Sequence, residues 1–316
     1  MTEWTLRYDG FQPAEEGLRE ALCTLGNGYF ATRGAAEEAE ADNTHYPGTY
    51  LAGGYNRLIT DIAGRSVENE DLVNMPNWLC LGFRPADGDW FNPLGCELLE
   101  YCQELDLRHG ILRRRIRFRD RADRITTLLT QRLVSMSNPH VGAVEWQITA
   151  ENWSGPAVLY SALDGRVINA GVPRYRQLAS THLQPLSTEL VAPDTVLLVV
   201  ETNQAKLRVA QAARTRLYHG DQGLDTKRTL LREDACIGQE MSVELPQGVP
   251  LRLEKVIAMH NGRDRAISEP ALAARQTVMD APGFAELLDC HSQAWMHLWR
   301  WRCPCCRSRP SSRPRH

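Results

Sequence analysis

Alternation of apolar and polar residues with a period of two is the pattern that most constrains the fold of this 316-residue chain. Over residues 141–150, Val144, Trp146 and Ile148 alternate with polar residues, as in a strand with one buried face. Two further segments alternate in the same way, and two others are more uniformly apolar, which is typical of strands buried on both faces. The alternating segments are residues 206–209 and 241–245, and the apolar ones are residues 128–134 and 196–200.

Short turn-forming sequences that contain Pro, Gly or Asp separate these segments. They occur at residues 86–89, 164–165, 193–194 and 246–248. Many short strands with such punctuation favour an all-β fold in which antiparallel sheets stack as a sandwich. We therefore predict an antiparallel β-sandwich over residues 1–265.

The apolar period changes near residue 268, which predicts a helical linker over residues 266–300. Ser268 followed by Pro270 is typical of a helix start, and a second helix is expected after Asp280. One stripe of that second helix is apolar and needs a packing partner, only part of which we expect the sandwich to supply. The stripe consists of Phe284, Leu287, Leu288, His291, Trp295, Leu298 and Trp299.

The last residues differ from the rest of the chain in composition and charge. Residues 301–316 are rich in Arg, Cys and Pro and show no periodicity, so we expect a disordered tail. Residues 300–316 hold six arginines and no acid, so the net charge of −3 leaves −9 for residues 1–299. An acidic body has no general attraction for nucleic acid or an anionic membrane, and we predict neither as a partner.

Two further absences bear on localisation. The longest aliphatic run, residues 196–200, is far shorter than the roughly 20 residues that a bilayer span requires. The first ten residues lack the basic and then apolar pattern of a secretion signal. The sequence therefore predicts a cytoplasmic protein.

A series of blocks, most of them rich in Gly, Asn, Pro and Trp, occurs in a fixed order between residues 25 and 169. They span residues 25–34, 46–56, 67–78, 104–113, 119–120, 135–140, 151–155 and 163–169. Together these blocks resemble the N-terminal domain of glycoside hydrolase family 65, which contains maltose, trehalose and kojibiose phosphorylases and acid trehalases. The resemblance covers about residues 4–300 and rests on the order of several long motifs.

The resemblance implies a galactose-mutarotase-like β-supersandwich, then a helical linker, then an (α/α)6 barrel that carries the general-acid Glu. It also implies cleavage of a disaccharide α-glucoside, such as maltose or trehalose, with inversion. The attacking group is inorganic phosphate or water, and no metal or other cofactor is needed. No position in this sequence matches the catalytic Glu, and the barrel is absent from it. We therefore expect no catalytic residue and no activity in this chain alone.

The expected role of such a domain is to brace the barrel and to contribute to contacts in a homodimer, as the resemblance implies. Two alternatives remain open. The chain could be a free-standing carbohydrate-binding or interaction module, since the barrel is absent. It could also be the non-functional product of a frameshifted gene, which the composition of the tail favours.

Asn74, Asn77 and Trp78 form the clearest candidate sugar-binding group, at the rim of the barrel's pocket. Amides both donate and accept hydrogen bonds, and an indole face can stack on a pyranose ring. Asn152 and Trp153 form a second group of the same kind. The simpler interpretation, in which Asn caps turns and Trp fills the core, is favoured for both groups.

Two groups of carboxylates have the composition that an inverting glycosidase needs, one acid and one base. Glu68, Glu70 and Asp71 form a cluster, while Glu104 and Asp106 alternate on an expected strand. The favoured interpretation is that these are solvated acids, because the resemblance places acid catalysis in the barrel.

Neither a metal site nor a phosphate-binding loop is predicted. Three thiols crowd residues 303–306 without the second spaced pair that structural zinc requires. Residues 25–30 lack the Gly spacing of a dinucleotide-binding or P-loop motif, and we expect turn glycines there.

Overall fold

The computed structural model describes residues 4–170, 178–265 and 269–302. The tail that the sequence predicts to be disordered lies outside the described residues from position 303 onward. The three cysteines of residues 303–306 lie outside them too.

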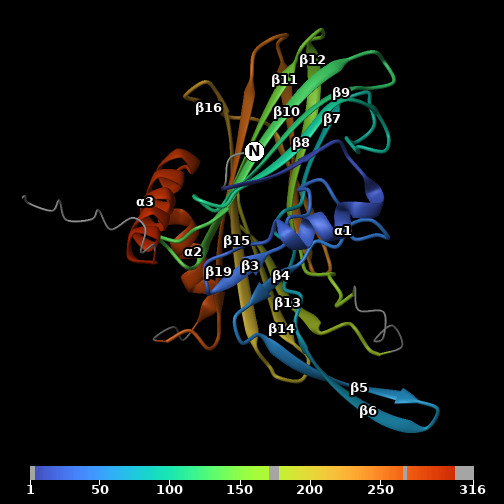
Figure 1. Ribbon diagram of the computed structural model, residues 1–316, viewed down its shortest axis with the longest axis vertical. Coiled ribbons are helices and arrows are strands. Elements are labelled where there is room, and N and C mark those ends of the chain that lie inside the picture. Colours follow the sequence, from blue (N-terminus) through green and yellow to red (C-terminus); the bar gives the residue numbers. More distant parts are fainter. Residues whose placement is uncertain (1–3, 171–177, 266–268, 303–316) are drawn as a thin grey trace, which may run out of the picture.

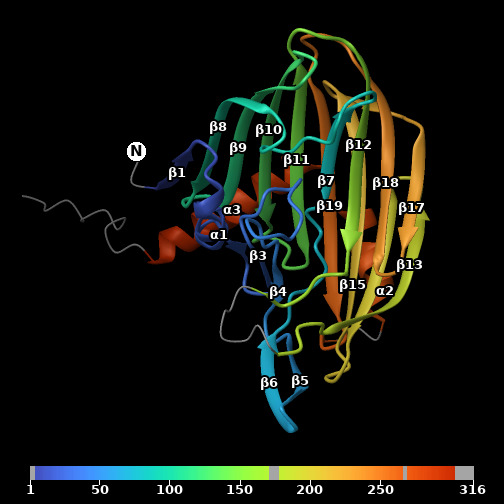
Figure 2. The same ribbon diagram turned by 90° about the vertical axis from the view of Figure 1, so that its right-hand side faces the viewer.

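Two antiparallel sheets stacked face to face form the body of the molecule (Figures 1 and 2). The larger is a ten-stranded sheet in which β16 (Gln222–Leu224) pairs with β15. Its other strands, in spatial order, are β1 (Thr5–Asp9), β8 (Glu97–Asp106), β9 (Ile111–Arg119), β10 (Ile125–Val134), β11 (Val141–Ala150), β19 (Leu251–Asn261), β15 (Arg208–His219), β14 (Thr195–Thr202) and β13 (Leu183–Ala192). The smaller is a four-stranded sheet of β17 (Arg228–Glu233), β18 (Cys236–Leu245), β12 (Gly155–Asp164) and β7 (Leu81–Pro85). This architecture confirms the predicted all-β fold.

Five short strands complete the described β structure. The strands β2 (Leu25–Gly26), β3 (Phe30–Thr32) and β4 (Thr49–Leu51) form a small sheet beside the body. The hairpin of β5 (Tyr55–Ile62) and β6 (Arg65–Leu72) projects away from it (Figure 1).

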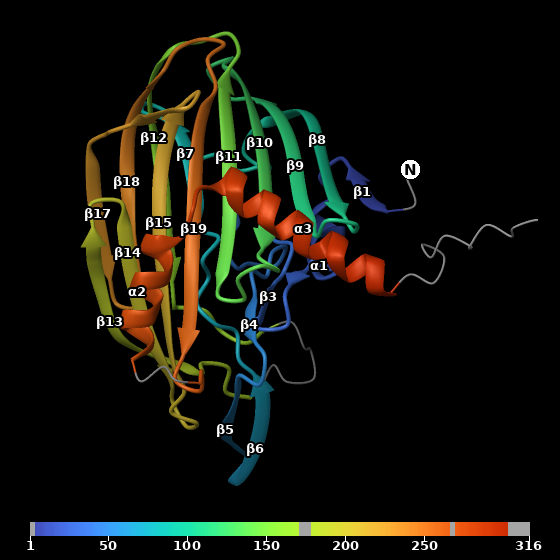
Figure 3. The same cartoon turned by 90° about the vertical axis from the view of Figure 1, so that its left-hand side faces the viewer.

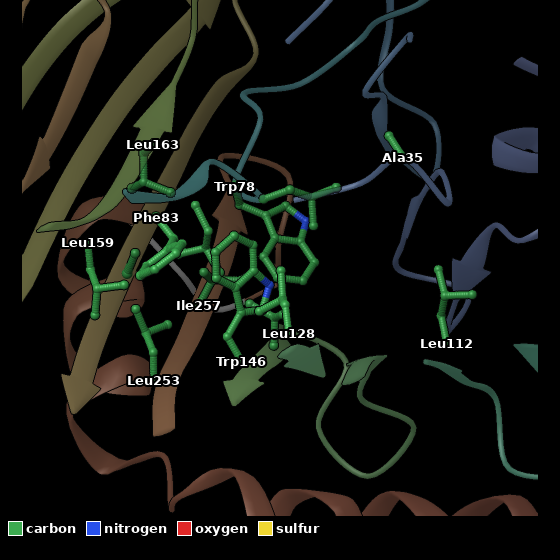
Figure 4. Packing of buried hydrophobic residues seen from close by; sticks show 14 of the residues in the cluster. Ala35, Trp78, Phe83, Leu112, Leu128, Trp146, Leu159, Leu163, Leu253 and Ile257 are labelled. Carbon is green, nitrogen blue, oxygen red and sulfur yellow. The ribbon is translucent and has the colours of Figure 1, made fainter. Parts of the chain in front are cut away.

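The main hydrophobic core lies between the two large sheets (Figure 4). Trp146 of β11 and Leu253 of β19 enter it from the ten-stranded sheet, while Phe83 of β7 and Leu159 of β12 enter it from the four-stranded sheet. Trp78 fills the space between them and has no exposed surface. Burying side chains of this size is the main stabilising contribution to a sandwich of this kind.

The strand patterns predicted from the sequence are largely confirmed. Val144, Trp146 and Ile148 are fully buried, whereas the polar residues between them are less so. All residues over 196–200 are buried, because the helix of residues 270–280 covers the outer face of β14. The strand predicted over residues 206–209 is wrong in its first half: β15 begins at Arg208, and the residues before it form a turn.

One helix was not anticipated. α1 (Pro13–Leu22) begins with Pro in its first turn, carries Glu15 and Glu16 there and has Arg19 in its last turn. These are ordinary signals of a helix start and end, so the sequence contained the information. The helix buries Arg19, which bonds the carbonyl of Gly10 and the carboxylates of both glutamates.

Two helices follow the last strand and lie across the outer face of the ten-stranded sheet (Figure 3). They are α2 (Pro270–Asp280) and α3 (Phe284–Arg302). Ser268, the predicted cap of α2, lies outside the described residues; Glu269 is the N-cap and accepts a hydrogen bond from the Ala271 amide. The predicted helical segments are therefore present.

Most of the apolar stripe of α3 packs on the sandwich domain, while Leu298 stays 36% exposed, so the expectation that part of its partner lies elsewhere stays a prediction. Phe284 and Leu287 are buried against β10, β11 and β19. Further along, the Trp299 indole donates a hydrogen bond to the Arg108 carbonyl at 2.7 Å and contacts Trp4 edge to face. Both tryptophans of the stripe are partly buried.

Candidate functional site

A cleft of about 790 Å³ opens on the outward face of the four-stranded sheet, and we call it the outer cleft. Its floor includes Tyr160 of β12 and Glu240 of β18, which are direct register partners and alternate with core residues. Its walls are loops that contain residues 36–42, 90–94 and 166–168. Figure 2 shows the four-stranded sheet with these neighbouring segments beside it.

Asn74 and Asn77, two of the predicted sugar-binding residues, line this cleft. Asn74 is buried. Its side-chain oxygen accepts a hydrogen bond from the Thr49 amide, and its side-chain nitrogen donates to the carbonyls of Pro47 and Ile168, so it ties the cleft walls together. The Asn77 side-chain oxygen accepts a hydrogen bond from the Leu79 amide at 3.0 Å. Its side-chain nitrogen has no hydrogen-bond partner among the described residues.

Trp78, the third predicted residue, does not face the cleft. Its indole nitrogen donates to the Thr32 hydroxyl at 2.9 Å, and its ring lies in the core. With no exposed surface, the ring offers no face on which a sugar could stack in this chain. Its position supports the loop that carries the two asparagines from the inside.

A buried group of four charges forms the back of the outer cleft. Arg114 binds Glu37 at 2.6 Å and Glu38 at 2.8 and 2.6 Å, and Arg132 binds Glu37 at 3.0 Å. The indole of Trp146 lies 3.3 Å from Glu37. Burial raises the pKa of Glu37, but the two guanidinium groups outweigh it and hold the pKa below its ordinary value. The group is neutral overall and fixes the 36–38 loop on the ten-stranded sheet.

A carboxylate–histidine pair stands at one edge of the cleft. The Nδ1 of His45 lies 2.9 Å from a carboxylate oxygen of Glu20, which is 1% exposed. Burial lowers the pKa of His45, but the bond to Glu20 and the charge of Glu20 more than offset this, so the net shift is upward. Glu20 also accepts from the Tyr46 amide, so one buried acid positions two residues that line the cleft.

The aromatic side of the cleft was missed by the sequence reasoning. Trp90 is 42% exposed and lies over β7, where Gly82 has no Cβ that would meet the ring. Tyr160 contacts the same indole edge to face, with ring centroids 6.2 Å apart, and the Arg84 guanidinium lies 5.0 Å from its centre. The sequence predicts only a turn over residues 86–89. Nothing in the local pattern indicates that Trp90, which follows this turn, lies over β7.

The acids considered as catalytic pairs lie away from the outer cleft and are engaged by basic partners. On the projecting hairpin, Arg57 bonds Glu70 at 2.6 Å and lies 3.6 Å from Glu68. Asp71 lies 3.4 Å from His182, a buried residue at the base of that hairpin. These contacts favour the simpler interpretation of this cluster.

The second acid group alternates on β8, as predicted. Glu104 faces Arg7 at 3.9 Å, while Asp106 bonds His109 at 2.8 Å and Arg113 at 3.4 Å. Burial raises the pKa of Asp106, but these partners outweigh it, and the net shift is downward. A carboxyl group with a lowered pKa is a poor proton donor near neutral pH.

The second amide–indole group serves structure. Asn152 caps the turn before β10 through a bond from the Ile125 amide and a bond to the Asp123 carbonyl. The Trp153 indole is 9% exposed and donates to the Thr126 hydroxyl. Neither residue lies in the outer cleft.

One group of possible metal-ligating residues occurs among the described residues: His140, His260 and Asp264. The two imidazoles stack with ring centroids 3.8 Å apart and planes 14° apart. The lone pairs of an imidazole lie in the ring plane, so rings stacked in this way do not converge on one ion. In this arrangement His260 instead bonds the Thr277 hydroxyl of α2 at 2.9 Å.

The family model of the glycosyl hydrolase family 65 N-terminal domain matches residues 6–298. The chain belongs to this family. The resemblance inferred from the motif blocks is thereby confirmed. Residues 303–316 lie beyond the matched segment.

Several family 65 relatives match most of this domain. It is 44% identical over 300 residues to an uncharacterized glycosyl hydrolase of Mycobacterium tuberculosis, covering 95% of this chain and 22% of that protein. It is 30% identical over 218 residues to a kojibiose phosphorylase of Caldanaerobacter subterraneus, covering 69% of this chain and 27% of that protein. The solved structure of a candidate kojibiose phosphorylase from the human microbiome shares the fold, with a TM-score of 0.80, 16% identity and coverage of 94% of this chain and 38% of that one.

The family 65 domain thus spans only about a fifth to two fifths of the length of these relatives. Among the residues that the structure describes, none of the helices combines the length and apolar character that crossing a bilayer requires.

Proposed function

We propose that this chain is the non-catalytic N-terminal domain of an enzyme that cleaves a disaccharide α-glucoside with inversion, by phosphorolysis or hydrolysis. The family match over residues 6–298 carries the proposal. The relatives' names include kojibiose, trehalose and maltose phosphorylases, so the substrate class is a glucose disaccharide and inorganic phosphate is the expected co-substrate.

The absence of activity in this chain alone is part of the same proposal. The carboxylates that could form an acid–base pair are held by arginines or histidines, and the downward-shifted pKa of Asp106 disfavours proton donation. The role we propose is mechanical: the sandwich and its two helices brace the catalytic portion and contribute contacts to a homodimer in the cytoplasm.

Asn74 and Asn77 are proposed to approach the sugar from the rim of the catalytic pocket, with Trp78 as their internal support. Asn77 carries the recognition, because its side-chain nitrogen is not used by the described residues. The Asn74 side chain is already committed to three backbone partners.

An activity assay tests the proposal. The purified chain is incubated with kojibiose, maltose and trehalose, each with and without inorganic phosphate, and released glucose is measured. We expect no release. A chimera in which this chain replaces the N-terminal domain of the Caldanaerobacter kojibiose phosphorylase is expected to recover phosphorolysis, with the domain-deleted enzyme as the control. Turnover by the chain alone would contradict the proposal, as would an inactive but folded chimera.

A further inference from the structure

We infer that the outer cleft is a saccharide-binding site in its own right, with Trp90 as the stacking platform and Glu240 and Asn77 as hydrogen-bonding groups. Binding in this cleft needs no catalytic portion, but the choice of glucose as the sugar rests on the proposed function. The ligand class is a short, neutral oligosaccharide of glucose.

The floor of the cleft has an unusual composition for an outward sheet face. Residues 82, 160 and 240 lie side by side on β7, β12 and β18, because Tyr160 is the register partner of both Gly82 and Glu240. Without a side chain at position 82, the Trp90 indole lies directly on the strand. The result is a flat aromatic surface flanked by a carboxylate, and a pyranose ring fits such a surface through its apolar C–H face and its hydroxyl groups.

The aromatic platform is held rigidly although it is exposed. The Phe91 amide donates to the Phe83 carbonyl at 2.8 Å, which fixes the loop above β7. Tyr160 and the Arg84 guanidinium pack on the indole. An aromatic side chain that is ordered and still 42% exposed loses little conformational freedom when a ligand stacks on it.

Some polar groups of the cleft already form an ion pair within the protein, whereas others have no partner among the described residues. Glu38 is neutralised by Arg114, and Asp164 is neutralised by Arg166 at 2.8 Å. The carboxylate of Glu240 and the side-chain nitrogen of Asn77 form no hydrogen bond or ion pair with any described residue. One acceptor and one donor therefore remain for a ligand on a floor that is otherwise satisfied.

Charge and size restrict the ligand further. Six carboxylates line the cleft, at residues 37, 38, 40, 42, 164 and 240. Arg114 and Arg166 pair with those at 37, 38 and 164, and the other three would repel a phosphate-bearing ligand. A volume of about 790 Å³ lies within the range of small-molecule sites, about 300–1,000 Å³. A neutral chain of a few pyranose rings satisfies both conditions.

Calorimetric titration of the full chain with maltose, maltoheptaose and cellobiose tests the inference. We expect maltoheptaose to bind, and Trp90→Ala to weaken its binding roughly tenfold, or about 1.4 kcal/mol, because the ligand loses both the buried area and the stacking contact of the ring. Trp90→Phe should retain part of the affinity. The matched control is Tyr55→Ala, which removes an exposed aromatic ring from the projecting hairpin and should leave binding unchanged.

A second variant guards against misfolding. Glu240→Gln keeps the shape of the floor and removes one charge, so the fold should survive while affinity falls several-fold. Unaltered circular dichroism is required of every variant. The inference fails if none of the three saccharides binds at millimolar concentration, or if they bind equally well to the wild type and to folded Trp90→Ala.

Discussion

The outward faces of the two large sheets differ in what covers them. On the ten-stranded sheet, α2 and α3 bury Phe284, Leu287, Ala274 and Val278, and a histidine ties each helix to the sandwich (Figure 3). On the four-stranded sheet, the corresponding face carries an exposed tryptophan and polar groups that the described residues leave unused. The comparison indicates that the first face stabilises the domain, whereas the second is available for a ligand.

The first prediction concerns the buried charges behind the outer cleft. Arg114→Ala would leave two buried carboxylates with one guanidinium, and we expect it to lower the free energy of unfolding by about 3–5 kcal/mol. Chemical denaturation monitored by tryptophan fluorescence measures this. The control is Arg119→Ala, which breaks a partly exposed pair with Glu97 and should change stability little. A small effect at Arg114 would mean that the cleft does not depend on this group.

The second prediction contrasts the two faces directly. Phe284→Ala opens a cavity between α3 and the ten-stranded sheet and should cost about 3 kcal/mol. Trp90→Ala removes a larger side chain, but one that is 42% exposed, and it should cost less than Phe284→Ala. The same denaturation experiment compares them. Equal losses would show that the exposed tryptophan is also a structural residue.

The third prediction uses pH. Burial lowers the pKa of His260 to about 4, with the nearby His140 adding to the effect, and burial also lowers the pKa of His291. Because the unfolded chain binds more protons than the folded one, their contribution to stability is lost as the pH falls below the ordinary histidine value of about 6.5. For His260 we expect the free energy of unfolding to fall between pH 6.5 and 4.5 by about 1 kcal/mol per pH unit, and His291 should add to the fall.

The histidine at the outer cleft should respond in the opposite direction. The pKa of His45 is raised by Glu20, so its contribution is fully present below the ordinary histidine pKa and is lost as the pH rises through the raised value. Denaturation curves at several pH values for His260→Gln and His45→Gln separate the two. A flatter acid slope is expected only for the first variant, and an unchanged slope would exclude His260 as the source.

The smallest predicted effect lies at Gly82. A Cβ at this position would lie 3.1 and 3.2 Å from carbon atoms of the Trp90 ring, so Gly82→Ala should shift the indole by a few tenths of an ångström. We expect a loss of saccharide affinity of only a few-fold and almost no loss of stability. Calorimetry with maltoheptaose measures it, and an unaltered affinity would mean that the ring position is not critical.

The fold was more predictable than the site. The period-two pattern of β11 and the apolar run of β14 depend on local burial, so the sequence carries them directly. The start of β15 and the whole of α1 were misassigned or missed, although α1 has ordinary boundary signals. Which strands pair across the sandwich is decided by contacts between distant residues, and no local pattern reports this.

The outer cleft shows why site residues are harder to predict. Asn74 and Asn77, which line the cleft, share one sequence motif, so they could be named together from the sequence as candidates. Trp90, Tyr160 and Glu240 come from three separate elements and meet only through the register of the four-stranded sheet. Trp78 carried the same chemical signal as Trp90, but it is buried, and only the structure separates a core indole from an exposed one.

The most direct test of the central claim is a nuclear magnetic resonance titration of the isotope-labelled chain with maltoheptaose. The account predicts shifts for the Trp90 indole and for the backbone amides around Tyr160 and Glu240, with none for amides beneath α2 and α3. Shifts confined to the helix-covered face, or no shifts at millimolar saccharide, would contradict it.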